Sequence, residues 1–257
     1  MTLTSQVTLD NRPPAVSVVI PLYRSRKNFE NILDLSRQLF PLFDSKSELL
    51  LINDGDPDLF DVSIYDEFLI IGCPVQLVTL KQNFGQMTAT LCGLSMAKSP
   101  TVLTVDADTC CNARLLRDLV LKSQTARHLA YLNVLSTTSK RPLLRDVLSQ
   151  VNKKVFAYLV KNIDLRNYSG SSVRAVERSL VESLLEEGVC AELIDIWLLN
   201  AAVKTSFIPY QGTKEYSTSY SAWSLVLFVF RFVKCFVKKR TPFNATDYIY
   251  QTEKLAG

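Results

Sequence analysis

The sequence predicts a single α/β domain in which a mainly parallel, doubly wound sheet is flanked by helices. Short apolar runs rich in branched side chains alternate with segments of helical periodicity, a pattern typical of parallel sheets. Polar residues follow each apolar run, as expected where strands end at a shared edge. The predicted strands are residues 16–20, 49–52, 76–80 and 101–105, and the predicted helices are residues 27–40, 85–97 and 113–124.

Turn and capping residues support these elements in chain order. The first apolar run stops at Pro21, and the second stops at the turn signal Asn-Asp-Gly of residues 53–55. The helix over 27–40 carries apolar side chains at helical spacing. Gly85 opens the second helix, and Asn112 is a typical N-cap for the third.

Composition limits the class of protein. The chain has 257 residues, 47% of them hydrophobic, which suits one domain with a sizeable core. A net charge of +4 is too small to indicate a nucleic-acid-binding protein. No Cys-x-x-Cys occurs and His128 is the only histidine, so we expect no structural zinc site. The polar N-terminal residues lack the apolar core of a secretion signal, so we expect a cytoplasmic protein.

One polar side chain follows each predicted strand: Tyr23, Asp54, Asn83 and Asp106. The carboxyl ends of parallel strands lie at one edge of a sheet, and ligands bind there. We therefore expect these four residues to converge on one site.

Asp106 and Asp108 stand one residue apart at the tip of the fourth predicted strand. Hard divalent cations such as Mg²⁺ bind through one or two carboxylates plus substrate phosphates, and they neutralise charge on a departing group. Turns also favour Asp, so an ordinary strand-to-turn connection is the alternative interpretation. Asp54 could accept a hydrogen bond from a nucleotide base, or it could be an ordinary turn residue of Asn-Asp-Gly. The N–H groups near Gly85 could face an anion.

Four motifs carry a family resemblance: Pro21-x-Tyr23, Asn53-Asp54-Gly55, Gln82-Asn83-x-Gly85-Gln86 and Asp106-Ala107-Asp108. They resemble glycosyltransferase family 2 over residues 16–125, and the likeness continues more weakly to about residue 235. The second half is similar to the branch of dolichyl-phosphate mannose synthase and undecaprenyl-phosphate sugar transferases, through Gly-Ser-Ser-Val-Arg at residues 170–174.

This resemblance implies the GT-A fold for a transferase domain at residues 15–215. Residues 1–14, which end in Pro13-Pro14, are expected to form a flexible tail, and residues 216–257 a C-terminal amphipathic helix and tail. Within the domain, residues 15–125 would form the nucleotide-sugar half and residues 126–215 the acceptor half.

The resemblance also implies residue roles. Asp106 and Asp108 would hold Mg²⁺ or Mn²⁺ against the diphosphate of the donor, and Arg174 would contact a phosphate of the donor or of a lipid acceptor. A UDP-sugar is the expected donor, and transfer with inversion is the expected reaction. The nucleotide-sugar site would comprise Pro21, Tyr23, Asp54, Asn83, Gly85, Gln86 and Asp106, with Asp54 on the base.

Two acceptor classes remain open. A polyprenyl phosphate is already ionised, whereas a sugar hydroxyl needs a general base. Glu192 matches the first acid of the family's acidic pair, Leu193 replaces the second, and Asp195 lies one helical turn further on. Glu192 could equally be a solvated residue of a helix's first turn.

Some positions depart from the family pattern. Arg24-Ser25 stands where Asn-Glu is common, and Ser219 stands where lipid-phosphate relatives often have Lys or Arg. A catalytically impaired nucleotide-sugar-binding protein with the same fold is therefore the alternative function.

The C-terminal region indicates membrane contact. Residues 221–237 are mostly apolar, with a polar stripe at Ser224, Arg231 and Lys238, and a basic cluster follows at residues 238–240. Such a helix can lie in the interface of an anionic membrane; a buried core helix is the alternative. We expect a peripheral protein at the inner face of the cytoplasmic membrane, acting on a membrane-associated acceptor (polyprenyl phosphate or lipid-linked glycan).

Overall fold

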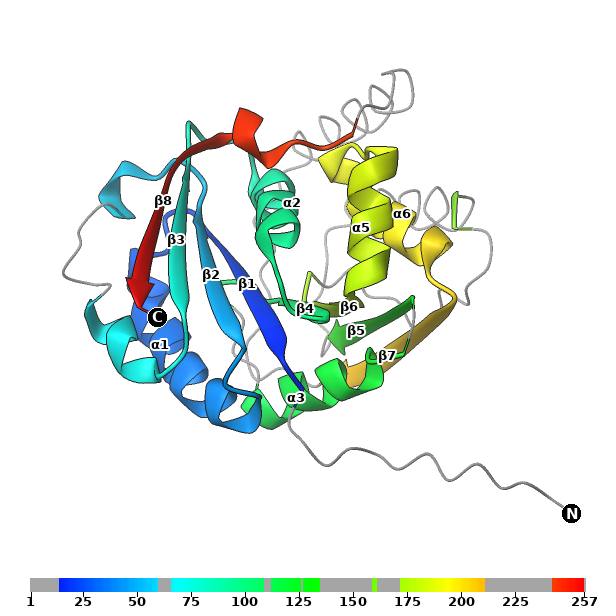
Figure 1. Cartoon of the computed structure of the whole chain (residues 1–257), viewed down its shortest axis with the longest axis horizontal. Coiled ribbons are helices and arrows are strands. Elements are labelled where there is room, and N and C mark those ends of the chain that lie inside the picture. Colours follow the sequence, from blue (N-terminus) through cyan, green and yellow to red (C-terminus); the bar gives the residue numbers. More distant parts are fainter. Residues whose placement is uncertain are drawn as a thin grey trace, which may run out of the picture.

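A computed structural model describes residues 14–59, 66–108, 112–125, 127–134, 159–160, 172–210 and 242–256 (Figure 1). Its strands are β1 (Val16–Leu22), β2 (Glu48–Asn53), β3 (Val75–Leu80), β4 (Thr101–Thr104), β5 (His128–Val134), β6 (Arg174–Glu177), β7 (Lys204–Tyr210) and β8 (Ile249–Ala256). Its α-helices are α1 (Phe29–Leu39), α2 (Gln86–Met96), α3 (Ala113–Lys122), α5 (Arg178–Glu187) and α6 (Ile194–Ala201).

The described strands form a mixed sheet in the order β7-β5-β6-β4-β1-β2-β3-β8. The four strands predicted from the sequence, β1 to β4, are mutually parallel and occupy its centre, with Pro21 of β1 opposite Ile52 of β2. β6 runs antiparallel to β4 and β5, and β8 runs antiparallel to β3. The predicted mainly parallel, doubly wound sheet is therefore confirmed, with antiparallel strands added on both sides.

Helices cover both faces of the sheet, and each face has its own apolar core. α1 and α3 pack on one face, where Phe29, Ile32 and Leu116 join the inward side chains of β1 and β2. α2, α5 and α6 pack on the other face (Figure 1). Strands β1 to β4 are buried along their whole length, which explains why they appear in the sequence as continuous apolar runs.

The predicted helices all form, within a few residues of their expected ends. The side chain of Asn112 caps α3 by accepting a hydrogen bond from the backbone N–H of Arg114 at 2.8 Å. The strand β6 begins at Arg174, the last residue of the Gly-Ser-Ser-Val-Arg motif, and α5 follows it directly.

The C-terminal assignment needs a correction. Residues 249–256, expected to belong to a tail, form β8 at the edge of the sheet. The amphipathic helix expected before them falls on residues 221–237, which lie outside the described residues, as does nearly all of the expected tail at 1–14.

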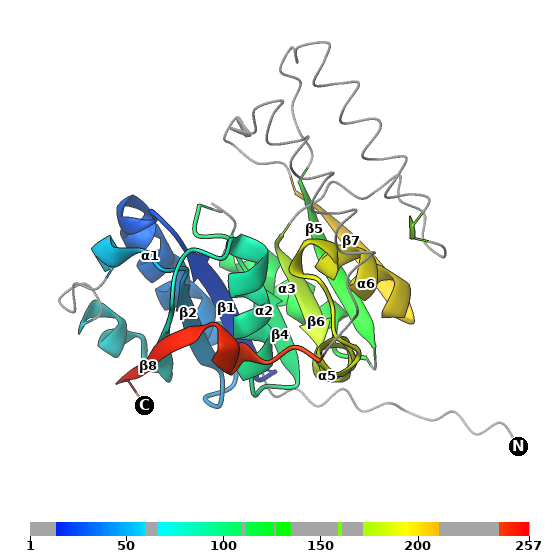
Figure 2. The same cartoon turned by 90° about the horizontal axis from the view of Figure 1, so that it is seen from above.

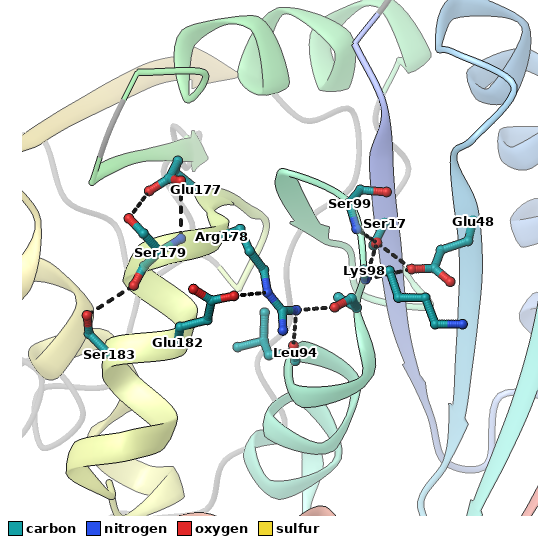
Figure 3. Close-up of polar contacts among 11 residues, drawn as sticks. Ser17, Glu48, Leu94, Lys98, Ser99, Glu177, Arg178, Ser179, Glu182 and Ser183 are labelled. Carbon is teal, nitrogen blue, oxygen red and sulfur yellow. Dashed lines mark hydrogen bonds and ion pairs between the residues drawn. The ribbon is translucent and has the colours of Figure 1, made fainter.

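A buried carboxylate at the amino-terminal ends of the strands has a structural role (Figure 3). Glu48 accepts hydrogen bonds from the Ser17 hydroxyl at 2.7 Å and from the backbone N–H of Lys98 at 2.8 Å. Nearby, the Arg178 guanidinium donates to the carbonyls of Leu94 and Ala97 and so caps the end of α2. These contacts fix α2 against the sheet from the end opposite to the polar strand ends described next.

Candidate functional site

The chain reverses its direction of travel across the sheet at β1. From β1 it adds β2 and β3 on one side, then returns to add β4 on the other side. In open α/β sheets such a switch point leaves a crevice beyond the carboxyl ends of the two diverging strands. Tyr23 follows β1, Asp54 follows β2, and Asp106 lies two residues beyond β4, so the structure brings these predicted residues to one edge.

Asp54 is buried at this edge, with 2% of its surface exposed. Its Oδ1 accepts from the backbone N–H of Phe84 at 2.8 Å, and its Oδ2 accepts from that of Gly85 at 2.9 Å. Burial raises the pKa of the Asp54 carboxyl, and the two backbone hydrogen bonds partly offset that rise. Asp54 therefore ties the end of β2 to the start of α2.

Gly85 is the N-cap of α2 and has φ 94°, a backbone conformation that favours glycine. The first turn of α2 therefore begins next to the Asp54 carboxylate. Asn83, two residues earlier, is exposed beyond the end of β3.

Asp106 joins two parts of the chain that are far apart in sequence. Its Oδ1 accepts from the side-chain amide of Gln86, and its Oδ2 accepts from the hydroxyl of Ser172. Burial raises the pKa of the Asp106 carboxyl most strongly and the negative charge of Asp108 raises it further, while Ser172, Arg174 and Gln86 lower it. Asp108 is exposed. Ser172 was not among the predicted site residues, although it belongs to the Gly-Ser-Ser-Val-Arg motif at residues 170–174.

Arg174 lies behind Asp106 and is fully buried. Its guanidinium forms an ion pair with Asp195, and the Tyr131 hydroxyl donates a hydrogen bond of 2.8 Å to the same carboxylate oxygen, Oδ1. The Nε and Nη2 atoms of Arg174 have no hydrogen-bond partner within the part of the chain that the structure describes. The structure thus pairs the predicted residues Arg174 and Asp195 directly, and it adds Tyr131 to Asp195, a contact that the sequence did not reveal.

Glu192 and Asp195 have different surroundings, although the sequence places them one helical turn apart. Glu192 lies in the 3₁₀ turn Ala191–Leu193 before α6, and its charge acts on Tyr248 near the C-terminus. Asp195 lies in α6 and faces Arg174 and Tyr131. Only Asp195 is connected through these contacts to the Asp106 side of the site.

The residues at the tip of β1 are arranged differently from the expectation. Pro21 is buried inside β1, whereas Tyr23 is 43% exposed. The guanidinium of Arg24 lies 5.4 Å from the centre of the Tyr23 ring. Arg24 has φ 51°, and its backbone N–H donates to Asp56 at 2.6 Å, which fixes this unusual conformation. Of the two predicted residues Pro21 and Tyr23, Tyr23 is therefore the one whose side chain can face a ligand.

Among the residues that the structure describes, no three His, Cys, Asp or Glu side chains gather closely enough to hold a metal ion without other ligands. In the same part of the chain, no helix has the length and apolar character needed to span a bilayer.

Two named transferases resemble this chain, one along most of its length and one over about a third of it. It is 24% identical over 226 residues to an undecaprenyl-phosphate 4-deoxy-4-formamido-L-arabinose transferase of Pseudomonas fluorescens, covering 86% of this chain and 64% of that protein. A transferase of the same name from Aeromonas hydrophila is 33% identical over 93 residues, which cover 36% of this chain and 28% of that protein. The chain thus spans about two thirds of the length of the relatives that it matches most fully.

Solved structures share the fold at low sequence identity. Glucosyl-3-phosphoglycerate synthase from Mycobacterium tuberculosis superposes with a TM-score of 0.59 and 15% identity, covering 88% of this chain and 81% of that one. Mannosyl-3-phosphoglycerate synthase from Rubrobacter xylanophilus gives a TM-score of 0.55 and 13% identity, covering 94% and 86%. The Mycobacterium enzyme has also been crystallised with Mn²⁺ and UDP-glucose.

The family model for glycosyl transferase family 2 matches residues 17–174. The matched stretch is more than half of the chain and contains Asp54, Gln86, Asp106 and Asp108. This protein therefore belongs to glycosyl transferase family 2.

Proposed function

We propose that the protein is a metal-dependent, inverting glycosyltransferase that moves a sugar from a UDP-sugar to a membrane-associated acceptor. The observation that carries the proposal is the meeting of Asp54, Gln86 and Asp106 at the switch point of the sheet. Asp54, which would recognise the nucleotide base, and the carboxylates of Asp106 and Asp108, which would hold the metal ion on the diphosphate, then lie at the same edge of the sheet. This is the arrangement that a nucleotide-sugar donor needs.

The carboxylate pair fits a divalent cation. Asp106 and Asp108 repel each other in a partly desolvated place, and a bound cation would remove that repulsion. Two protein carboxylates suit Mg²⁺ or Mn²⁺ when substrate phosphates complete the coordination. The ion would supply charge neutralisation for the departing diphosphate. Gln86 and Ser172 would hold the Asp106 carboxylate in orientation.

Asp54 fits the donor's base by its remaining acceptor capacity. Each carboxylate oxygen can accept more than one hydrogen bond, and among the described residues one backbone donor contacts each. Tyr23, exposed at the tip of β1, would offer its ring for stacking. The first turn of α2 would direct free N–H groups toward the phosphates.

The favoured acceptor is a polyprenyl phosphate. The relatives of P. fluorescens and A. hydrophila are named for transfer to undecaprenyl phosphate, and an acceptor phosphate needs no strong general base. The charge of Arg174 acts on Asp106, and two of its donor nitrogens have no hydrogen-bond partner among the described residues. Its full burial means that an acceptor phosphate would approach it only after a local rearrangement. A lipid-linked glycan hydroxyl is the other acceptor within this proposal.

A transfer assay with matched acceptors tests the proposal. The full chain is incubated with a panel of UDP-sugars, Mn²⁺ and either undecaprenyl phosphate or undecaprenol in detergent. Sugar attached to the phosphate acceptor alone, and abolished by chelation, is the expected result. Nucleotide-sugar binding without transfer to any acceptor would instead favour the catalytically impaired binding protein.

The base candidates separate the acceptor classes. With a hydroxyl acceptor, replacing the true base should slow turnover by about 10²–10⁴-fold while donor binding stays unchanged. With a phosphate acceptor, Glu192→Gln should change turnover by less than about tenfold. Glu192→Gln is the cleaner variant, because Asp195→Asn also breaks the ion pair with Arg174.

A further inference from the structure

The described C-terminal segment, residues 242–256, lies beside the proposed donor site. β8 pairs with β3 so that Ile249 is opposite Leu80, the last residue of β3. Tyr248 therefore stands next to the point where β3 leads into the site. Figures 1 and 2 show this segment passing across α2 before it joins the edge of the sheet.

Three contacts attach this segment to the connection between β3 and α2. The backbone N–H of Lys81 donates to the carbonyl of Tyr248 at 2.9 Å, and the Lys81 Nζ donates to the carbonyl of Asp247 at 2.7 Å. The Tyr248 ring meets the Phe84 ring edge-to-face, with centroids 5.1 Å apart. The Phe243 ring also stacks on the Tyr248 ring, with centroids 5.3 Å apart.

Phe84 is the link between these rings and the site. Its backbone N–H donates to Asp54, and Gly85, the next residue, donates to the other oxygen of the same carboxylate. Gln82 and Asn83 just before it are exposed. The side chain of Phe84 is therefore the part of this connection that packing can hold in place, and Tyr248 packs against it.

We propose that Tyr248 is a positioning residue for the nucleotide-sugar donor, acting through Phe84. Its ring keeps the Phe84 and Gly85 N–H groups on Asp54, so that Asp54 and the start of α2 are oriented before the donor arrives. This inference rests on the proposed function for the role of Asp54. It assigns a donor-site role to a part of the chain that lies beyond residues 17–174, the stretch that the family model matches.

Replacement of the ring tests the inference. In Tyr248→Ala the edge-to-face contact is lost, and we expect UDP to bind roughly three- to tenfold more weakly in the presence of Mn²⁺. Hydrogen exchange of the Phe84 and Gly85 amides should accelerate by at least the same factor. Tyr248→Phe retains the ring and should match the wild type in both measurements.

Tyr250→Ala is the matched control, because Tyr250 lies two residues away and is 70% exposed. It should leave affinity and exchange unchanged. If Tyr248→Ala does not fold, Tyr248→Leu keeps apolar bulk without an aromatic edge and should show the same two effects. Wild-type exchange and affinity in the folded Ala or Leu variant would overturn the inference.

The exchange measurement needs no nucleotide, so the two proposals can fail separately. A wild-type protein that binds no nucleoside diphosphate would contradict the proposed function. Acceleration of the two amides in Tyr248→Ala would still show that Tyr248 positions this turn, whereas unchanged exchange would exclude it.

Discussion

Asp106 accepts hydrogen bonds on both carboxylate oxygens and still lies beside a second negative charge. Burial raises its pKa above the ordinary value of 3.8, and Asp108 adds to that rise. A carboxyl whose pKa is raised on folding binds its proton more tightly in the native state. It therefore contributes stability at acid pH, and that contribution is lost as pH rises through the raised pKa. At neutral pH the ionised pair costs stability unless a cation is present.

Asp108→Asn tests this electrostatic description. Without metal, the variant should be slightly more stable than the wild type at neutral pH, by on the order of 0.5 kcal/mol or about 1–2 °C in melting temperature. The difference should shrink as pH falls through the raised pKa of Asp106, because protonation of Asp106 removes the repulsion. Mn²⁺ with UDP should stabilise the wild type and not the variant. Melting curves over a pH series provide the measurement, and a variant that Mn²⁺ and UDP stabilise as much as the wild type would contradict the metal assignment.

Individual site residues were predictable to different degrees. Asp54, Gln86 and Asp106 follow recognisable strands or turns, and the structure brings them to one edge. Arg174 was expected to contact a phosphate, and the structure shows it buried against Asp195. That pairing depends on how β6 packs against α6. A single sequence contains no local signal for it.

Two of the turns around the site approach each other closely through their backbones. Gly55 has φ 69°, and a Cβ atom there would lie 2.3 Å from the carbonyl carbon of Gln82. The turn after β2 therefore touches the turn after β3 so closely that only glycine fits. This contact places Asp54 within reach of Phe84 and Gly85.

Gly55→Ala and Gly72→Ala form a matched pair for this contact. Both glycines have positive φ, 69° and 77°, but a Cβ at Gly72 would have no atom within 4 Å. Gly72→Ala should cost about 1 kcal/mol, from backbone conformation alone. Gly55→Ala should cost more, because backbone atoms must also move, and it should weaken UDP binding. Denaturant unfolding of both variants measures the difference, and equal losses would show that the close approach is unimportant.

Among the secondary-structure elements, the central strands were predicted from the sequence and the outer strands were missed. β1 to β4 are buried on both faces and so form continuous apolar runs. β8 is an edge strand with exposed polar residues such as Gln251 and Lys254, and its partner β3 is more than 150 residues away. Neither property produces a local pattern that distinguishes a strand from a tail.

At the scale of the whole molecule, the proposed acceptor requires contact with a membrane. The basic cluster Lys238, Lys239 and Arg240 and the apolar residues before it lie outside the described residues. The chain returns at residue 242 to the C-terminal segment beside the donor site. A membrane-bound segment at residues 221–240 would therefore join directly to the donor side of the protein.

Changing Lys238, Lys239 and Arg240 together to Gln tests membrane contact. Each basic residue near an anionic surface contributes about 1 kcal/mol, so binding to anionic liposomes at low salt should weaken by roughly two orders of magnitude. Nucleotide affinity should be unaffected. Equal sedimentation of the wild type and the triple variant with anionic liposomes would count against membrane contact through this cluster.

The most direct test of the central claim is calorimetric binding of UDP, GDP and dTDP to the full chain with and without Mn²⁺. The claim is that Asp54, Asp106 and Asp108 together form a metal-dependent nucleotide site at the switch point of the sheet. We predict that UDP binds to the wild type only when Mn²⁺ is present. Asp106→Asn and Asp108→Asn should each abolish this Mn²⁺-dependent binding. Asp54→Asn should weaken UDP binding but leave it dependent on Mn²⁺. Binding that persists after chelation, or that all three variants retain at wild-type strength, would contradict the claim.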